Sequence, residues 1–226
     1  MEHNSKQLVT QLWDTENIRH TMNRLAYYLS SQERQRILTE LWTKDHTDTA
    51  SLGYNNGFYV GMDEITRHFA QQFRVLSTGD ARMSTMSTPL IKIAGDGNTA
   101  QFLGYMPGFV SYRGGNRTMD SYMTLGLCFA DLIKENGVFK IWHLIFTHDH
   151  TMEAGKAYHE VPIWDWNDPM AEEFGTPTLP RTLQAEGYGW EHLYEDMPRE
   201  LPTYTPKYSY GPEGDFGKKY FDRDKR

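Results

Sequence analysis

The hydrophobic pattern of this 226-residue chain changes its period once, between residues 73 and 89. Before that point, apolar residues recur at helical spacing, and after it they alternate as they do in strands. Ile18, Met22, Leu25 and Leu29 show the first pattern most clearly. Helices followed by a run of strands predict an α+β domain, with the helices packed on one face of a curved antiparallel sheet.

Three N-terminal helices are expected. The first begins at an N-cap residue, for which Asp14 and Thr15 are the candidates. The second carries the apolar residues of segment 37–42, and the third begins after Gly61 with an apolar stripe along one side. Together they supply three amphipathic faces to cover a sheet.

Four strands are expected in the second half. They cover residues 89–93, 99–112, 121–134 and 138–147. Two Gly-containing turns, at 95–98 and 135–137, have the composition of tight hairpin turns. The second strand contains Met106-Pro107-Gly108, where we expect it to bend.

The composition changes again beyond residue 150. Eight of the ten prolines lie there, together with 15 Asp or Glu and 9 Lys or Arg. The segment is also rich in Trp and Tyr, unlike most disordered acidic tails. We therefore predict one domain over residues 1–150 and an extension over residues 151–226 that wraps the core or a neighbouring subunit.

Charge and cysteine content exclude several classes of protein. The net charge of −7 and the absence of a Lys/Arg cluster argue against a nucleic-acid partner. The one cysteine, Cys128, lies in an apolar run and is interpreted as a buried filler. The N-terminus has no signal-peptide pattern, and no apolar run approaches the roughly 20 residues of a membrane helix. We expect a soluble cytoplasmic protein with no membrane partner.

Several segments, taken in order, resemble the nuclear transport factor 2-like superfamily, in particular its bacterial SnoaL-like branch. The segments that carry the resemblance are Arg-Leu-Ala-Tyr-Tyr-Leu (24–29), Leu41-Trp42, Gly-Phe-Tyr-Val-Gly-Met-Asp-Glu-Ile (57–65), Pro89 with Ile91, the 95–100 hairpin and the 137–141 strand. The similarity covers about residues 10–150. It implies a conical, cystatin-like α+β roll around a deep apolar pocket, in a homodimer or homotrimer. It also implies a function among lyases, dehydratases, isomerases, polyketide cyclases and non-catalytic binders.

Several enzymes of that superfamily pair an Asp at the end of the first helix with a His on the first long strand. Here the first position falls in Ser30-Ser31-Gln32-Glu33 and the second near residues 82–88, and neither holds the expected residue. The resemblance therefore implies either relocated catalytic groups or none.

His143 is the leading candidate for a relocated catalytic group. It shares strand parity with Phe139, Ile141 and Ile145, and the family's geometry points that face into the cone. A buried neutral imidazole suits a general base. The other interpretation is a structural His bonded to a backbone carbonyl. The opposite face, with Trp142, Leu144 and Phe146, is predicted to form an oligomer interface on the outside of the sheet.

Tyrosines and apolar residues complete the predicted pocket. Tyr28 and Tyr59 are candidate catalytic hydroxyls, although aromatic packing is the plainer interpretation of each. The predicted substrate-binding residues are Tyr54, Asn55, Phe58, Trp42, Phe69 and Met86. His68 flanks the apolar stripe of the third helix and could reach the pocket, although a position on the helix surface is the simpler interpretation.

A metal site is the less favoured alternative. His148 and His150 lie at i and i+2, and a third ligand would come from Asp45, His46 or His159. No HExxH or CxxC motif accompanies them, and GxGxxG, P-loop and GxSxG motifs are absent too. No metal or cofactor is therefore predicted.

The leading functional hypothesis is a cofactor-independent lyase or isomerase acting on a hydrophobic aromatic or polycyclic molecule. Dehydration of a hydroxylated ring and loss of formaldehyde from a lignin-derived aromatic diol are two reactions that the resemblance allows. The alternative is a non-catalytic binding or assembly protein of the same fold.

Overall fold

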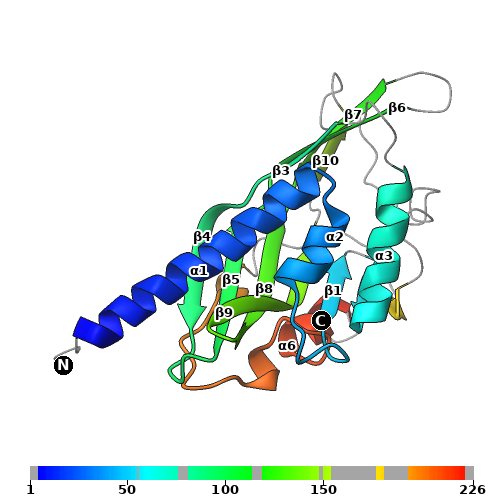
Figure 1. Ribbon diagram of the computed structural model, residues 1–226. Helices are drawn as coiled ribbons and strands as arrows, with labels where there is room; N and C mark the ends of the chain where they lie inside the picture. The colour runs from blue at the N-terminus through cyan, green and yellow to red at the C-terminus, as the bar shows by residue number, and fades with distance from the viewer. Residues whose placement is uncertain are drawn as a thin grey trace.

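Three helices form in the first third of the chain, as predicted, but the strands β1 (Ser51–Tyr54) and β2 (Gly57–Val60) lie between the second and the third. The computed structural model describes residues 5–54, 56–75, 81–113, 119–147, 150–153, 177–180 and 193–221. The helices are α1 (Ser5–Ser30), α2 (Arg34–Arg36), which continues into the π-helical turn η1 (Ile37–Leu41), and α3 (Met62–Val75). Helix α1 runs diagonally across one face of the sheet, and α3 stands beside β1 and β2 (Figure 1).

Two sheets make up the β-structure. The seven-stranded sheet has the order β11-β2-β1-β9-β8-β5-β4, and the four-stranded sheet has the order β10-β7-β6-β3. The strands of the larger sheet are β11 (Leu179–Pro180), β2 (Gly57–Val60), β1 (Ser51–Tyr54), β9 (Val138–Phe146), β8 (Leu127–Glu135), β5 (Thr99–Tyr105) and β4 (Ser87–Ile93). Those of the smaller sheet are β10 (His150–Glu153), β7 (Met119–Leu125), β6 (Gly108–Arg113) and β3 (Ala81–Ser84).

The two sheets are successive halves of one curved meander. Each strand of the smaller sheet is next in sequence to a strand of the larger one, and the order β9-β8-β5-β4 repeats as β10-β7-β6-β3. The predicted bend separates β5 from β6 at Met106-Pro107, and Gly126 separates β7 from β8. The sheet curves without closing, so the α+β prediction with three helices and a conical antiparallel sheet is confirmed.

Apolar side chains pack on both faces of the larger sheet. The inner cluster joins the helices to the sheet, with Ile18, Met22 and Leu25 of α1 against Phe139 and Ile141 of β9. The outer cluster consists of Phe58, Leu103, Leu127, Phe129, Ile145, Tyr210 and Phe216. A sheet with both faces covered needs apolar residues at nearly every position, and β8 and β9 supply them.

One extra residue in β9 reverses its alternation. Asp131 of β8 is opposite His143, whereas the next residue, Leu132, is opposite Ile141. Trp142 therefore forms a β-bulge, and every later side chain of β9 lies on the opposite face of the sheet from the one that an unbroken strand would give it. Leu144 and Phe146 consequently lie in the inner cluster and Ile145 in the outer one. The prediction that Leu144 and Phe146 face an oligomer interface is wrong for this reason.

Helix α1 begins earlier than expected. It starts at Ser5, and both candidate N-caps, Asp14 and Thr15, lie well inside it. The buried Asp14 carboxylate accepts a hydrogen bond from Lys134 Nζ at 2.7 Å, so Asp14 ties the helix to β8. No helix in the described ranges is long and apolar enough to cross a membrane.

The C-terminal part of the chain lies against the outer face of the sheet. We call residues 199–217 the C-terminal strap; it includes the turn η4 (Pro206–Tyr208) and the start of α6 (Asp215–Phe221), and follows the short helix α5 (Leu193–Asp196). The amides of Gly95 and Asp96, in the β4–β5 turn, donate to the carbonyls of Leu201 and Pro202. The buried strap residues Tyr210 and Phe216 contact Phe129 of β8.

Replacing Phe216 tests whether the strap belongs to the folded core. Phe216→Ala is expected to lower the free energy of unfolding by about 3–5 kcal/mol, since it opens a cavity beneath the strap. Tyr194→Ala, at a side chain that is 84% exposed, should change it by no more than about 0.5 kcal/mol. Denaturant unfolding measures both changes in free energy. If Phe216→Ala lowers the free energy of unfolding no more than Tyr194→Ala does, the strap adds nothing to the core.

Candidate functional site

An imidazole and two phenols meet on the inner side of the sheet. His68, on α3, is only 1% exposed. Its ring centroid lies 4.3 Å from that of Tyr59 and 5.0 Å from that of Tyr54. Phe69 and Phe146 complete the surroundings, with centroids 5.6 Å from His68 and 5.4 Å from Tyr54 respectively. We call these five residues the aromatic cage.

Strand alternation places the two tyrosines in the aromatic cage. Strands β1 and β2 form an antiparallel hairpin in which Leu52 is opposite Tyr59 and Tyr54 is opposite Gly57. Side chains alternate between the faces of a strand, so Tyr54 and Tyr59 both point inward. Gly57 has φ of +144°, and a Cβ there would lie 2.3 Å from the Leu179 carbonyl oxygen, so the turn requires glycine.

The phenol of Tyr59 is held protonated by its surroundings. Burial raises the pKa of Tyr59 to about 12, against smaller opposing contributions from the Asn56 hydrogen bond and the Arg67 charge. The Asn56 side-chain amide donates to the Tyr59 hydroxyl at 3.2 Å. Tyr59 can therefore donate a proton to a substrate oxygen at any physiological pH.

The other predicted pocket residues divide between the two faces. Trp42 and Phe69 are fully buried in the inner cluster, and Met86 packs against it. Phe58 does not line the cone: it belongs to the outer cluster, because it alternates with Tyr59 on β2. Asn55 lies outside the described residues.

Tyr28 is engaged away from the aromatic cage. Its hydroxyl donates to a Glu40 carboxylate oxygen at 2.9 Å and accepts from Arg24 Nη2 at 2.7 Å. The guanidinium of Arg36 also lies over its ring, 5.0 Å from the centroid. Tyr28 thus anchors η1 to α1 through a charged, partly exposed cluster, so we assign it no part in the chemistry of the cone.

The two segments to which the resemblance assigns the family's Asp/His pair, 30–33 and 82–88, meet in space through the Ser30 side chain and the Ser84 backbone. The Ser84 amide of β3 donates to Ser30 Oγ at 2.9 Å, and Ser30 Oγ also contacts the Ser84 carbonyl oxygen at 3.3 Å. Ser30 is the last residue of α1. The contact fastens the helix end to the strand and offers no proton acceptor of the kind that an Asp/His pair provides.

His143 faces outward, contrary to the prediction. The Trp142 bulge places its imidazole on the outer face, where Nδ1 lies 2.9 Å from Asp131 Oδ2. A Cβ on Gly211 of the strap would lie 3.1 Å from the His143 ring, so only glycine fits beneath it without displacement. The inference that His143 acts inside the cone is therefore wrong.

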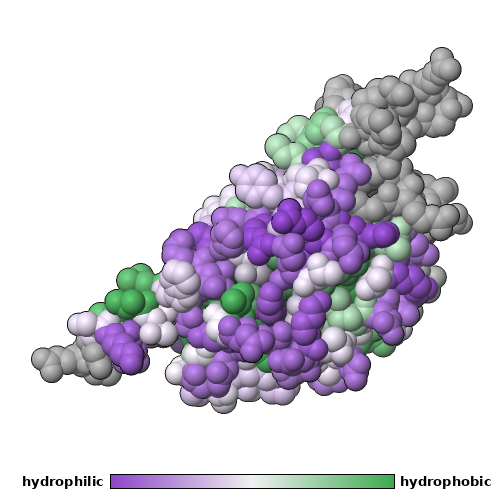
Figure 2. All heavy atoms as spheres, in the orientation of Figure 1, coloured by the Kyte–Doolittle hydropathy of each residue, from purple (hydrophilic) through white to green (hydrophobic). Residues whose placement is uncertain are grey.

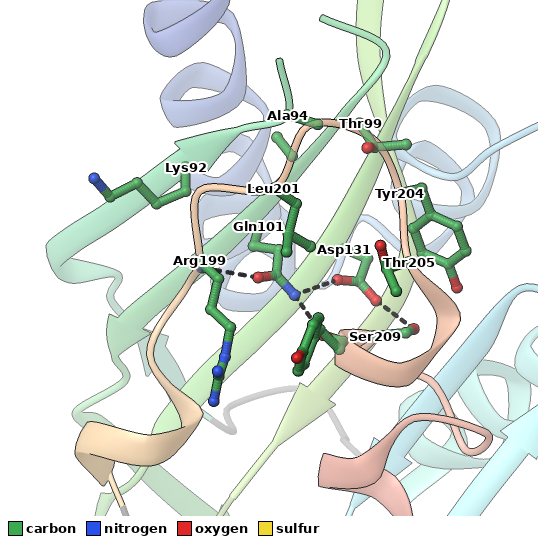
Figure 3. Close-up of a pocket in the computed structure, with 12 residues that line it drawn as sticks. Lys92, Ala94, Thr99, Gln101, Asp131, Arg199, Leu201, Tyr204, Thr205 and Ser209 are labelled. Atoms are coloured by element: carbon green, nitrogen blue, oxygen red, sulfur yellow. Dashed lines mark hydrogen bonds between the residues drawn. The ribbon is translucent and has the colours of Figure 1, made fainter. Parts of the chain in front are cut away.

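His143 belongs to a buried polar network that fastens the strap. Figure 3 shows Asp131, Gln101 and Ser209 of this network. Asp131 Oδ2 accepts hydrogen bonds from Ser209 Oγ and from the Tyr210 amide, both at 2.7 Å. Gln101 Nε2 donates to Asp131 Oδ1 at 3.2 Å and to the Tyr208 carbonyl at 2.7 Å. The strand residues Gln101 and His143 and the strap segment 209–210 thus all contact the Asp131 carboxylate.

This network contains Ser, His and Asp but lacks the geometry of a catalytic triad. In a triad the imidazole stands between the serine and the carboxylate, with one ring nitrogen for each. Here Ser209 Oγ and Asp131 Oδ2 both approach Nδ1, at 3.0 and 2.9 Å. The crevice beside it encloses about 10 Å³, enough for about one water molecule. We assign the network to fastening the strap.

No metal cluster of three His, Cys, Asp or Glu side chains occurs within the ranges that the structure describes. Of the predicted ligands, His148 and His159 lie outside those ranges, and of His150 only the backbone is described. Cys128 is fully buried in the inner cluster, and burial raises the pKa of its thiol, as suits a packing residue.

The sequence interpretation favoured a surface position for His68, which is wrong because the side chain is 1% exposed, and it did not single out Asp131. His68 follows the buried Ile65 by three positions and precedes the buried Phe69, a spacing that places it on the core face of α3. Asp131 continues the alternation of Leu127 and Phe129 on the outer face of β8. A carboxylate within the apolar run 127–133 was therefore the available signal for the buried network.

The sequence matches the profile of the SnoaL-like domain family over residues 10–145. The chain belongs to this family, and the predicted resemblance is confirmed. A comparison with curated protein sequences finds no match.

Solved structures with the same fold are distant in sequence. A protein from Novosphingobium aromaticivorans, provisionally designated a scytalone dehydratase, is 16% identical, with a TM-score of 0.54 over 67% of this chain and 94% of its own. The hexachlorocyclohexane dehydrochlorinase LinA-type3 from Novosphingobium barchaimii is 13% identical, with a TM-score of 0.54 over 69% and 99%. The Kfla4162 protein from Kribbella flavida is 12% identical, with a TM-score of 0.53 over 63% and 95%.

Removing the shared carboxylate tests the fastening network. Asp131→Ala should lower the free energy of unfolding by roughly 3–5 kcal/mol, because His143, Ser209 and the Tyr210 amide would lose their common acceptor in a buried place. Ser209→Ala removes the hydrogen bonds that Ser209 Oγ makes with Asp131 and with the Gly211 amide but leaves the carboxylate its other donors, so it should cost only about 1–2 kcal/mol. Denaturant unfolding measures both variants. If Asp131→Ala lowers the free energy of unfolding no more than Ser209→Ala does, the role of the Asp131 carboxylate as a shared acceptor is contradicted.

Alkaline pH is expected to destabilise the fold through buried tyrosines. Burial raises the pKa of Tyr59 and of Tyr204 to about 12, and that of Tyr210 well above its ordinary value. Below pH 10 these phenols are protonated in the folded and in the unfolded protein. Between about pH 10 and 12 only the unfolded chain loses the protons, so the free energy of unfolding falls as the pH rises. When the free energy of unfolding is measured across that range, its fall should be less steep for Tyr59→Phe. Tyr194→Phe, at an exposed position, is the control and should leave the slope unchanged.

Proposed function

We propose that this protein is a cofactor-independent lyase or isomerase whose reaction takes place at the aromatic cage. The observation that carries the proposal is the burial of His68 between the rings of Tyr54 and Tyr59. An imidazole can take a proton from carbon, and a phenol can hydrogen-bond the oxygen on which charge develops. These two roles suffice for an elimination or an isomerisation without a cofactor.

In a dehydration, His68 would remove a proton from the carbon next to the leaving group. The electron pair of that C–H bond would form the new double bond as the C–O bond breaks. Tyr59, protonated because its pKa is about 12, would hydrogen-bond the departing oxygen and supply its proton, which His68 then restores. Exclusion of water by the surrounding rings strengthens both interactions.

The names of two structural neighbours fit this reaction class. One is provisionally designated a dehydratase and another is a dehydrochlorinase, and both names denote elimination of a small molecule. For the present chain we propose an uncharged aromatic or polycyclic substrate, since rings of Tyr, Phe and His form the aromatic cage. A hydroxylated ring and a lignin-derived aromatic diol both meet this description.

Binding without catalysis is the second candidate function. It is favoured by the Ser30–Ser84 hydrogen bond, which occupies the place of the family's acid–base pair. In that case the same aromatic rings would hold a ligand that leaves unchanged.

Substituting His68 separates the two functions. His68→Gln is expected to reduce turnover at least about 100-fold, while a bound aromatic ligand dissociates with a similar constant, because the amide keeps polarity and volume but cannot take the proton. His20→Gln, on the exposed side of α1, is the matched control and should retain full activity. The assay measures release of water or formaldehyde from a panel of hydroxylated aromatics and aromatic diols.

Solvent deuterium provides a second readout. Wild-type protein in D2O should exchange the abstracted C–H position of a substrate or close analogue, and His68→Gln should not. Ligand binding without turnover or exchange by the wild type would support the binding function, and full activity of His68→Gln would contradict the proposed role of His68.

A further inference from the structure

The first turns of α1 project beyond the body of the protein. Every residue from Ser5 to Trp13 is exposed, and the first buried residue of the helix is Asp14. The helix end extends past the edge of the sheet in Figure 1, and its surface carries hydrophobic side chains in Figure 2. A helical segment of this length without packing is only marginally stable in water, so a partner surface would stabilise it.

Four large apolar residues form a stripe on this projection. Leu8, Val9, Leu12 and Trp13 are 43%, 65%, 68% and 68% exposed. At about 100° per residue they fall within an arc of about 140°. We call them the N-terminal stripe. Ile18 and Leu25, which pack into the inner cluster, lie on the opposite side of the helix, so the N-terminal stripe faces away from the body.

We propose that the N-terminal stripe is a self-association surface, on which a second copy of this chain packs with its own stripe in an antiparallel pair of α1 helices. A two-fold axis near residues 10 and 11 makes the surface complementary to itself. It places Leu8 against Trp13 of the partner and Val9 against Leu12 of the partner. All four apolar side chains are then buried in both copies.

Charge at the two ends of the N-terminal stripe favours the antiparallel arrangement. Lys6 lies at one end, and at the other lies Glu16, whose carboxylate pairs with Arg19 of the same helix and whose side chain remains 63% exposed. Antiparallel packing brings Lys6 of each copy to the end that holds Glu16 of the other. A parallel pair would place like charges side by side, which is unfavourable.

The exposed area sets the expected affinity. The four side chains present roughly 400–450 Å² of apolar surface per copy, about half of the ~800 Å² per partner that a stable interface buries. Flanking polar residues of the two helices supply part of the remainder. A dimer with a dissociation constant on the order of 1 µM is therefore expected.

Sedimentation equilibrium of the full chain tests the surface. From about 0.05 to 100 µM, the average mass of the wild type should rise from near that of one chain to near that of two. Leu12→Glu and Trp13→Glu should each weaken this association at least about tenfold. Tyr27→Glu is the matched control, because Tyr27 is 76% exposed on the same helix but lies outside the N-terminal stripe. Circular dichroism should show the same folded content in all variants.

Disulfide cross-linking tests the antiparallel arrangement. When Val9→Cys and Leu12→Cys proteins are mixed, the disulfide between the two different variants should form faster than that between two copies of either. Faster cross-linking of Val9→Cys with itself would overturn the antiparallel pair.

Three further results would overturn the proposal. In the first, the wild type stays monomeric up to about 100 µM. In the second, Leu12→Glu and Trp13→Glu leave the association unchanged. In the third, the α1 amides of residues 8–13 are protected from hydrogen exchange in the monomer. The last would show that another part of the same chain covers the N-terminal stripe.

Discussion

The extra residue in β9 determines how the two faces of this sheet differ. Before Trp142, the odd-numbered residues of β9 face the helices; after it, the even-numbered ones do. This shift places Leu144 and Phe146 in the inner cluster and turns His143 outward, opposite Asp131. Without it, an imidazole would occupy the apolar interior and an apolar residue would meet the Asp131 carboxylate, and both would be costly. The β9 bulge therefore decides which histidine is available inside the cone.

The two faces accordingly carry different kinds of interaction. On the outer face, Asp131 accepts hydrogen bonds from strand and strap, and apolar contacts such as that of Phe216 with Phe129 surround this polar centre. Satisfied buried hydrogen bonds of this sort fix one arrangement of a loop. On the inner face, aromatic rings surround the buried His68, where we propose that the reaction takes place. The polar network that fastens the strap and the proposed reaction site thus lie on opposite faces of one sheet.

Local sequence patterns predicted the layers of the fold but not the details that govern its sites. Alternating residues and Gly turns placed the four long strands, and Pro107 marked their bend, because these signals act between near neighbours. The β9 bulge has no local signal, since Trp142 fits an unbroken strand equally well. Ser209 lies 78 residues from Asp131, a contact that no local pattern encodes. The start of α1 was misplaced because Asp14, a typical N-cap, pairs instead with the distant Lys134.

We propose that the chemistry takes place at His68 and that His143 only fastens the strap. A crystal structure of the protein with a bound hydroxylated aromatic ligand tests this assignment most directly. The ligand ring is expected to lie against Tyr54 and Tyr59, with a carbon-bound hydrogen directed at His68 and an oxygen within hydrogen-bond distance of Tyr59. A ligand bound beside His143 on the outer face, with the aromatic cage unchanged, would contradict it.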